Sequence, residues 1–341
     1  MINQADYVVD LFRPGDAEGV VSLYRAIYGD DYPVKSVYDS AELIRQSSGE
    51  AYRTVARNAD GEVVGHMALY RSSPPNPELY EVGQMMVRQD YRQSDISVSM
   101  TKYVLAEIPK RYGLEQLWSE AVCNHLVTQR FAVQARFPAT ALEIDLMPAE
   151  SYVKAFTKGI ENTGRVSMLV CFKAYSTKRQ TVFLPRVYEE ALRYIYAGLE
   201  AEYSFVTGAE APADGSVSQG RTDVFTGAGV ARITLFAVGG DFSAFIGQAE
   251  KQARNAQAVV LQVFLPLSSC IDKAVLFLRQ NGYFLGGVLP RWFGGDGLLM
   301  QKLLVSPNWD GIKLYSKPAR RLLEFVKDDW REVAAFNDIA D

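Results

Sequence analysis

Apolar positions in the first half of the chain repeat with two different periods, which divide it into helices and strands. Apolar residues that recur every three or four positions predict a helix, whereas short apolar or alternating runs between turn residues predict a strand. We expect helices near residues 20–27 and 37–46 and at residues 96–112 and 127–135. We expect strands at residues 8–12, 51–57, 62–70, 79–87, 117–123 and 139–146.

Three local signals refine these elements. Asp16 precedes the first helix and is a suitable N-cap residue. Asp60-Gly61 separates two strand patterns and predicts a type I′ hairpin, in which both central residues have positive φ. Pro109 is expected to bend or end the third helix, because proline cannot donate a backbone hydrogen bond.

The order of these elements predicts the fold class. A helix pair follows the first strand, and a β-meander then leads into an α-β-α-β run. A meander followed by a β-α-β crossover implies a mixed sheet, antiparallel in its early strands and parallel at the crossover. Residues 1–150 are therefore expected to form an α/β domain with an α+β mixed sheet.

The second half shows a similar succession of patterns. We expect strands at residues 166–175, 181–184, 258–265, 284–290 and 298–304, and two more within residues 223–238. Helices are expected at residues 185–199, 242–256, 272–280 and 318–333. This organisation predicts a linker at 151–165, a second domain at 166–310 and a C-terminal helix and tail at 311–341. An unrelated α+β domain is the alternative for the second half.

Composition narrows the classes of function. Hydrophobic residues make up 48% of the 341 residues and charged residues 22%, so two ordinary cores can form. The net charge is −4 with acids and bases intermixed, which argues against nucleic acid as a partner. No apolar run approaches the roughly 20 residues of a membrane span. The first ten residues lack the pattern of a secretory signal, so we expect a cytoplasmic protein.

Cysteine and histidine are scarce. Cys123, Cys171 and Cys270 lie far apart and are odd in number, which excludes a disulfide framework. The histidines are His66 and His125, and no His, Cys and carboxylate cluster has the spacing of metal ligands. We therefore expect no metal.

One segment carries a resemblance to a known family. Residues 82–92 read Val-Gly-Gln-Met-Met-Val-Arg-Gln-Asp-Tyr-Arg, and residues 124–130 read Asn-His-Leu-Val-Thr-Gln-Arg, with Arg136-Phe137 downstream. These phrases resemble the central strand, the following loop and the next strand exit of the GNAT acyl-CoA N-acyltransferases. A narrower likeness, at residues 121–129 and 142–148, is to a little-characterised bacterial set of long, two-domain GNAT proteins.

The resemblance implies a site for acetyl-CoA or another acyl-CoA. In the family, a loop of the form Arg-x-x-Gly-x-Gly holds the CoA pyrophosphate through backbone N–H groups at a helix N-terminus. The matching residues here are Arg92, Gln93, Ser94, Asp95, Ile96 and Ser97, so both glycines are replaced. Met86, Val87 and Asn124 complete the implied cofactor-binding set, at a split between the strands at 79–87 and 117–123.

Two residues of the implied loop have alternative roles. Arg92 matches a cation that would meet phosphate oxygens, and a solvated surface arginine is the alternative. The carboxylate of Asp95 would repel a pyrophosphate, and we expect it to cap the helix that begins at Ile96. In that role it would occupy a backbone N–H that a phosphate would otherwise use.

Acyl transfer to an amine needs a base, and Glu81 and His125 are the candidates. The alternatives are an ordinary strand carboxylate for Glu81 and a loop-fixing hydrogen bond for His125; Glu120 is a weaker candidate. The family commonly uses a tyrosine to protonate the leaving thiolate, where this chain has Phe131 or Ala132. Cys123 is either an acyl carrier or, as we favour, a buried strand cysteine.

The sequence thus predicts tandem GNAT-like domains, the second of them degenerate. Val238–Phe242 would replace the pyrophosphate loop in the second copy, and Gly282-Tyr283 would match Arg136-Phe137. The predicted function is transfer of an acyl group from CoA to an amine on a small molecule or peptide. The rivals are a non-catalytic GNAT-like binding module and a subunit whose second half forms a homodimer interface.

Overall fold

The computed structural model describes residues 7–30, 32, 34–152, 164–213 and 215–338. These residues form two compact units, which we call unit 1 (up to Ser119) and unit 2 (from Glu120 onward). The units divide within a strand, whereas the domain boundaries at residues 150, 165 and 310 stay predictions. Most of the predicted linker lies outside the described residues. No described helix has an apolar stretch long enough to span a bilayer.

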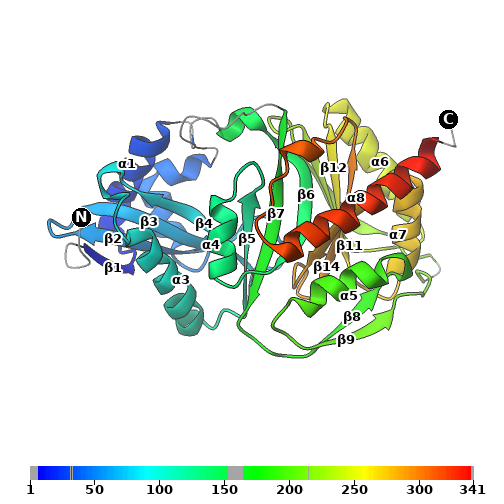
Figure 1. The fold of residues 1–341 in the computed structure, drawn as a ribbon, viewed down its shortest axis with the longest axis horizontal. Helices are drawn as coiled ribbons and strands as arrows, with labels where there is room; N and C mark the ends of the chain where they lie inside the picture. The colour runs from blue at the N-terminus through cyan, green and yellow to red at the C-terminus, as the bar shows by residue number, and fades with distance from the viewer. Residues whose placement is uncertain (1–6, 31, 33, 153–163, 214, 339–341) are drawn as a thin grey trace. The chain divides into compact units, whose positions relative to one another are not determined.

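Unit 1 begins with a strand and two helices and continues into a meander (Figure 1). Its strands are β1 (Tyr7–Leu11), β2 (Ala51–Asn58), β3 (Val63–Tyr70), β4 (Tyr80–Val87) and β5 (Gln116–Val122), the last of which continues into unit 2. Its helices are α1 (Ala17–Tyr28), α2 (Ser40–Gln46) and α3 (Ile96–Tyr112).

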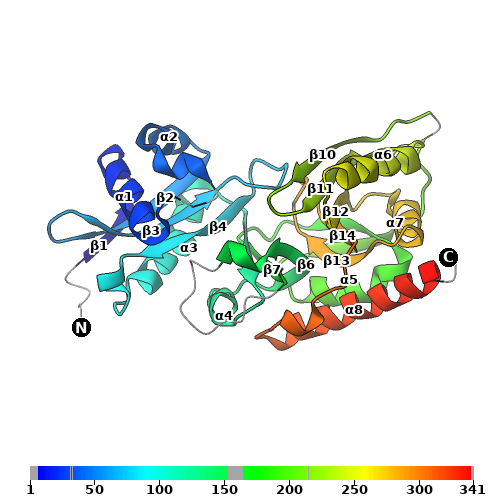
Figure 2. The same ribbon diagram turned by 90° about the horizontal axis from the view of Figure 1, so that it is seen from above.

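The sheet of unit 1 has the order β1-β2-β3-β4-β5. Neighbouring strands are antiparallel up to β4, and β4 and β5 are parallel across the α3 crossover. Helices α1 and α2 cover one face of this sheet and α3 covers the other (Figure 2). The apolar stripe of α1, including Val20 and Tyr24, packs with Leu43, Val55 and Met86 into a buried core. This arrangement leaves the end of β4 and the start of α3 at one edge of the unit.

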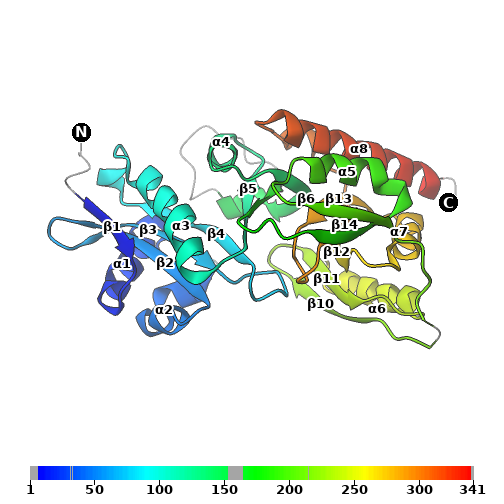
Figure 3. The same ribbon diagram turned by 90° about the horizontal axis from the view of Figure 1, so that it is seen from below.

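Unit 2 contains the remaining elements (Figure 3). Its strands are β6 (Ala139–Pro148), β7 (Arg165–Ala174), β8 (Gln180–Leu184), β9 (Tyr203–Thr207), β10 (Gln219–Phe225), β11 (Val230–Ala237), β12 (Val260–Pro266), β13 (Phe284–Leu289) and β14 (Gly297–Leu303). Its helices are α4 (Val127–Gln134), α5 (Glu189–Ala197), α6 (Phe242–Asn255), α7 (Ile271–Gln280) and α8 (Lys317–Asp338).

The main sheet of unit 2 has the order β7-β6-β13-β14-β12-β11-β10. Strands β11 and β12 are parallel across α6, and the other neighbouring pairs are antiparallel. Helices α5 and α8 lie on one face and α6 on the other (Figures 2 and 3). Strands β8 and β9 form a separate parallel pair. Both units therefore have mixed sheets with a β-α-β crossover, which confirms the predicted α/β class with a mixed sheet.

Several local expectations need correction. The hairpin at Asp60-Gly61 forms, but only Gly61 has positive φ, because the side chain of Asn58 accepts hydrogen bonds from the backbone N–H groups of Asp60 and Glu62 and shapes a different turn. Helix α3 continues past Pro109 to Tyr112. Asp16 does not cap α1, since its carboxylate pairs with Arg57.

Strand β9 escaped prediction, although its Tyr-Ser-Phe-Val-Thr sequence is rich in strand-forming residues. Among the described residues its strand partner is β8, so its position depends on pairing outside its own segment.

Helices α4 and α7 end in the same way. Their ends lie at Arg136-Phe137 and Gly282-Tyr283, the two motifs that the sequence analysis matched to each other. Arg136 and Gly282 both have positive φ, of 57° and 85°. The next residue in each case donates its backbone N–H to the carbonyl five positions earlier, Phe137 to Ala132 and Tyr283 to Leu278. This is a Schellman ending, which normally favours glycine at the positive-φ position. The shared ending supports the prediction that the two halves have a common fold, which stays a prediction.

A kink in β4 shapes the edge of unit 1. Gln84 has a φ of 54°, and the register between β3 and β4 shifts beside it, between His66 and Ala68. The kink turns the carbonyl of Gln84 toward His66, whose Nδ1–H donates to it over 3.2 Å. His66 is completely buried, and burial lowers its pKa to about 3, so the imidazole is neutral.

This burial predicts an acid-sensitive contribution to stability. In the unfolded chain His66 would take up a proton at its ordinary pKa of about 6.5, whereas the folded protein resists protonation until far lower pH. Stability is therefore lost as pH falls below 6.5. Between about pH 7.5 and pH 5, His66 alone should cost about 2 kcal/mol of unfolding free energy.

The measurement is urea unfolding at a series of pH values, on the parent and on His66→Gln. The variant should have lower stability at neutral pH but a flatter decline toward pH 5. His125 is present in both proteins, so its titration cancels in the comparison. Equal slopes in the two proteins would contradict the assignment.

Strand β13 meets β6 at a single close approach. Gly287 pairs with Ala141 and has a φ of 134°, and a Cβ atom there would collide with the carbonyl oxygen of Thr140 and lie 2.6 Å from the Cα of Ala141. Nearby, the buried amide of Gln301 on β14 accepts from Ile144 N–H and donates to the carbonyl of Leu142. The junction thus depends on a glycine and on one buried side chain.

Gly287→Ala should therefore destabilise unit 2 by roughly 2–4 kcal/mol, because backbone atoms cannot move aside as a flexible side chain can. Gly247→Ala is the matched control: this exposed glycine lies within α6, and a Cβ would meet nothing within 4 Å. It should be neutral or stabilising by up to about 1 kcal/mol. Chemical denaturation of both variants tests this, and similar stabilities would refute the steric argument.

Candidate functional site

The second half of β4 has an open backbone edge in unit 1. The parallel ladder with β5 consists of Tyr80↔Leu117 and Glu81↔Trp118. Beyond Glu81, the strand partners of β4 in the described part of unit 1 lie on β3, out to Val87. Because the kink at Gln84 follows at once, the strand turns away just where the predicted split begins. Open backbone groups at such a split can hydrogen-bond an extended ligand.

A compact turn links β4 to α3. Arg88 O accepts from Tyr91 N–H, and Tyr91 O accepts from both the backbone N–H and the hydroxyl of Ser94. The exposed Arg92 donates its Nε–H to the carbonyl of Val87 over 3.3 Å, so the guanidinium stays beside the strand end. Gln93 is also exposed on this turn. The turn places the predicted cation and the start of α3 on the same edge of unit 1.

The predicted capping role of Asp95 is wrong. Its side chain makes no bond to the helix backbone; instead it accepts from the hydroxyl of Tyr7 over 2.6 Å, and that hydroxyl also contacts Ser99 Oγ at 2.9 Å. Asp95 has φ −89° and ψ 12°, outside the extended conformation that capping residues usually adopt. Ser94 takes over part of the role, because its Oγ accepts from Ile96 N–H at 3.3 Å. The carboxylate nevertheless remains exposed at the helix start.

The start of α3 retains backbone donors. The first bond within the helix runs from Ser99 N–H to Asp95 O. The N–H groups of Ser97 and Val98 therefore precede the first residue that can find a partner within the helix. Together with the helix dipole, such groups favour an anion at this position.

Some of the predicted cofactor residues can contribute only backbone groups. The side chains of Met86 and Ile96 are buried, and Met86 belongs to the core beneath α1. Gly65 on β3 sits directly against Ile96, where a Cβ would lie 2.9 Å from its side chain. Their side chains fix the strand and the helix, whereas Arg92 and Gln93 are exposed and Val87, Ser94 and Ser97 are half-buried.

Glu81 lies at the start of the open edge. Its Oε1 accepts from the hydroxyl of Tyr70 at 2.6 Å. Gly83, two positions further along β4, has no side chain to displace that hydroxyl, and a Cβ there would lie 3.0 Å from it. The negative charge of Glu81 also helps to raise the pKa of Tyr32, whose main perturbation is burial. The carboxylate is thus partly buried, positioned and surrounded by phenols.

A cluster of four tyrosines was missed from the sequence. The rings of Tyr24 and Tyr28 each lie 5.0 Å from Tyr32, and Tyr24 lies 6.2 Å from Tyr38. Burial raises the pKa of Tyr28, and the charge of Arg92 partly offsets that rise. The charges of Glu81 and Arg92 thus each act on a tyrosine of this cluster. Tyr24, Tyr28 and Tyr32 recur every four residues, which was the available signal, and Tyr38 lies outside that spacing.

His125 and Asn124 belong to unit 2, in the turn between β5 and α4. Nδ1 of His125 accepts from Val127 N–H at 3.2 Å, which matches the loop-fixing alternative. Burial and the nearby Lys313 lower the pKa of His125, so it is neutral at physiological pH. Asn124 is partly buried. Of the predicted site residues, Glu81 and Arg92 to Ser97 belong to unit 1, with Glu81 near the start of β4 and the others after its end.

The remaining candidates give little support to chemistry in unit 2. Cys123 is fully buried and burial raises its pKa, so it fits a buried strand cysteine better than an acyl carrier. At the turn after β11, Gly239 and Gly240 donate their N–H groups to Ser218 Oγ and Ser216 O. The chain itself occupies these donors, so this turn does not present them to a phosphate. Within the described residues, no three His, Cys, Asp or Glu side chains are grouped to hold a metal ion.

Comparison with known proteins gives no match to any protein-family model. The search of curated proteins likewise gives no significant match.

Solved structures similar to this chain are acetyltransferases. A putative GNAT acetyltransferase from Desulfovibrio desulfuricans is 14% identical, over 50% of this chain and 99% of its own, with a TM-score of 0.37. The ribosomal-protein-S5-alanine acetyltransferase from Vibrio fischeri is 11% identical, over 51% and 95%, with a TM-score of 0.39. An aminoglycoside 6′-N-acetyltransferase complexed with coenzyme A is 12% identical, over 50% and 98%, with a TM-score of 0.37.

Proposed function

We propose that unit 1 binds an acyl-CoA and transfers its acyl group to an amine. The observation that carries the proposal is the juxtaposition at one edge of a kinked open strand, an arginine-bearing turn and a helix start with backbone donors. An extended pantetheine arm suits the strand, and a pyrophosphate suits the donors and Arg92. The motif resemblance of residues 82–97 implies the same ligand.

In this proposal Glu81 takes the proton from the attacking amine. The nitrogen lone pair adds to the thioester carbonyl, the C–S bond breaks, and the CoA thiolate leaves. Phe131 and Ala132 have no proton to give, so we propose that the thiolate is protonated by solvent. Tyr70 holds the carboxylate in place through its 2.6 Å hydrogen bond. A positioned base of this kind typically contributes about 10²–10⁴-fold in rate.

A cationic amine is the acceptor class that this surrounding favours. Glu81 supplies a negative charge, and tyrosine rings attract cations through their faces. Similar structures include a spermidine/spermine N-acetyltransferase and an aminoglycoside 6′-N-acetyltransferase, and spermidine and aminoglycosides carry several amines. Both are suitable first substrates to test. We also propose that the protein acts in the cytoplasm.

The direct test combines calorimetry with a thiol-release assay. Acetyl-CoA, longer acyl-CoAs and CoA are titrated first, and acetyl-CoA is then incubated with spermidine, an aminoglycoside and a peptide with a free N-terminus. Saturable binding with amine-dependent thiol release supports the proposal. Absence of acyl-CoA binding up to millimolar concentration refutes it.

A non-catalytic binding module is the second candidate. The specific observation in its favour is the exposed carboxylate of Asp95 at the helix start, where a phosphate would otherwise approach. Saturable acyl-CoA binding without thiol release from any of the amines would favour this candidate.

The charge of Asp95 should weaken CoA binding. Asp95→Asn removes the charge but keeps an oxygen to accept the Tyr7 hydroxyl, and Asp95→Gly also removes the side chain. Because the site is exposed and screened, we expect each variant to bind CoA about fivefold more tightly at low salt. The gain should shrink as salt rises. Weaker binding of CoA by both variants, measured by calorimetry, would show that the repulsion argument is wrong.

Glu81→Gln should lower kcat at least about tenfold while leaving the Kd for acetyl-CoA nearly unchanged. Glu78→Gln is the matched control, since Glu78 is an exposed carboxylate just before β4. His125→Asn tests the other candidate base in the same assay. Full turnover by both Glu81→Gln and His125→Asn across mildly acidic to mildly alkaline pH would exclude both residues as the base.

A further inference from the structure

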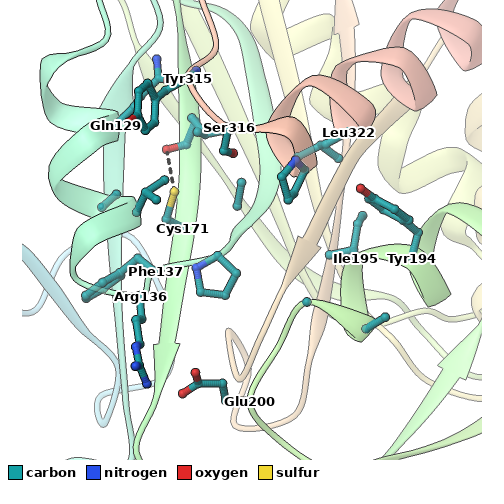
Figure 4. Close-up of a pocket in the computed structure, with 18 residues that line it drawn as sticks. Gln129, Arg136, Phe137, Cys171, Tyr194, Ile195, Glu200, Tyr315, Ser316 and Leu322 are labelled. Atoms are coloured by element: carbon teal, nitrogen blue, oxygen red, sulfur yellow. Dashed lines mark hydrogen bonds between the residues drawn. The ribbon is translucent and has the colours of Figure 1, made fainter.

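Unit 2 contains a cavity of about 530 Å³ that the proposed acyl-transfer site does not use. Its walls come from α4 and the segment after it, from β7, from the end of α5 and from the start of α8 (Figure 4). A cavity of this size lies within the usual range of small-molecule sites, which is about 300–1,000 Å³.

The walls are mainly apolar. Leu169 and Cys171 on β7, Phe137, Ile195 and Leu322 line the cavity and are each at most 5% exposed. The thiol of Cys171 is an unreactive part of this wall, because burial raises its pKa to about 12. An apolar group of a ligand would therefore be removed from water on entering, which is favourable in proportion to the area buried.

Polar groups at one end of the cavity are already satisfied. The Gln129 amide donates to the carbonyls of Val122, His125 and Lys313, and its oxygen accepts from Tyr315 N–H. Ser316 Oγ accepts from Ala319 N–H at the start of α8. This end requires nothing from a ligand.

The other end carries two opposite charges. Arg136 and Glu200 both line the cavity, and Figure 4 shows their side chains at the same end of the view. Neither side chain has an ion pair or hydrogen bond among the residues that the structure describes, and both are exposed. Lys173, whose pKa burial lowers, responds to both: Glu200 raises that pKa and Arg136 lowers it further. The ammonium of Lys173 is itself engaged with the carbonyl of Ala135 at 2.9 Å.

Arg136 has a backbone conformation that residues other than glycine rarely adopt. Its φ of 57° is one that glycine adopts without strain, whereas a side chain costs about 1–2 kcal/mol there. A glycine would complete the helix ending equally well but would leave the cavity without its cation.

We propose that this cavity binds a small zwitterion with an apolar side chain, namely an apolar or aromatic α-amino acid or dipeptide. The carboxylate of the ligand would pair with Arg136, its ammonium with Glu200, and its side chain would fill the apolar part. A charged guanidinium and a charged carboxylate that face one apolar space complement a ligand that has both charges and an apolar body. The proposal does not depend on acyl-CoA binding in unit 1.

The test compares ligands that differ by one charge, by calorimetry on the full chain. L-phenylalanine and L-leucyl-L-leucine carry both charges, phenylalaninamide and 2-phenylethylamine lack the carboxylate, and 3-phenylpropionate lacks the ammonium. At least one zwitterion should bind at least tenfold more tightly than each single-charge analogue. Equal binding of 3-phenylpropionate or 2-phenylethylamine, or no binding of either zwitterion up to millimolar concentration, would overturn the proposal.

Variants locate the site. Glu200→Gln and Arg136→Asn should each weaken zwitterion binding at least tenfold, and asparagine tolerates the positive φ of position 136. Glu202→Gln and Arg179→Gln remove exposed charges that do not line the cavity, and they should leave binding unchanged. Thermal unfolding confirms that each variant is folded. Unaltered zwitterion binding by folded Glu200→Gln and Arg136→Asn would place the ligand elsewhere and refute the assignment.

Discussion

The hydrogen bond from the buried His66 imidazole to the carbonyl of Gln84 is the constraint on which the site in unit 1 depends. An ordinary strand would direct that carbonyl into the sheet ladder, but the positive φ of Gln84 turns it inward. A buried carbonyl needs a donor, and a neutral histidine supplies one without burying a charge. The kink separates the start of β4, which pairs with β5, from the open end of the strand. Glu81 lies where the open edge begins, and the turn that carries Arg92 lies where it ends.

The two units share the same strand, turn and helix arrangement, but the backbone donors at the turn differ in their availability. Each has parallel strands joined through a helix, and each has a turn that leads from a strand into that helix. In unit 1 the N–H groups of Ser97 and Val98 precede the first bond within α3 and can meet a ligand, although Asp95 brings a negative charge beside them. In unit 2 the segment Ser216 to Ser218 fills the corresponding turn, and Gly239 is a glycine because a Cβ would collide with that segment. Availability of the donors therefore separates a possible anion site from a purely structural turn.

The proposal of acyl transfer in unit 1 rests on the contacts of the candidate bases. Glu81 is held by Tyr70 beside a tyrosine cluster, whereas His125 is held by its own loop. The charged end of the unit 2 cavity belongs to neither feature. Arg136 reaches it only because a residue other than glycine occupies the end of α4.

The sequence by itself determined the elements, their order and the α/β class, because periodic apolar positions and turn residues act locally along the chain. Helix α3 was predicted with its bounds, and the hairpin after β2 was predicted at the right residues. Tertiary structure decided whatever depends on a distant partner. The hydroxyl of Tyr7 binds the carboxylate of Asp95, which therefore does not cap α3, and β8 is the strand partner of β9 within the described residues. Tyr24, Tyr28 and Tyr32 recur every four residues, but only the fold brings Tyr38 to them. A capping or turn residue has several possible partners of similar energy, and only the folded chain selects one.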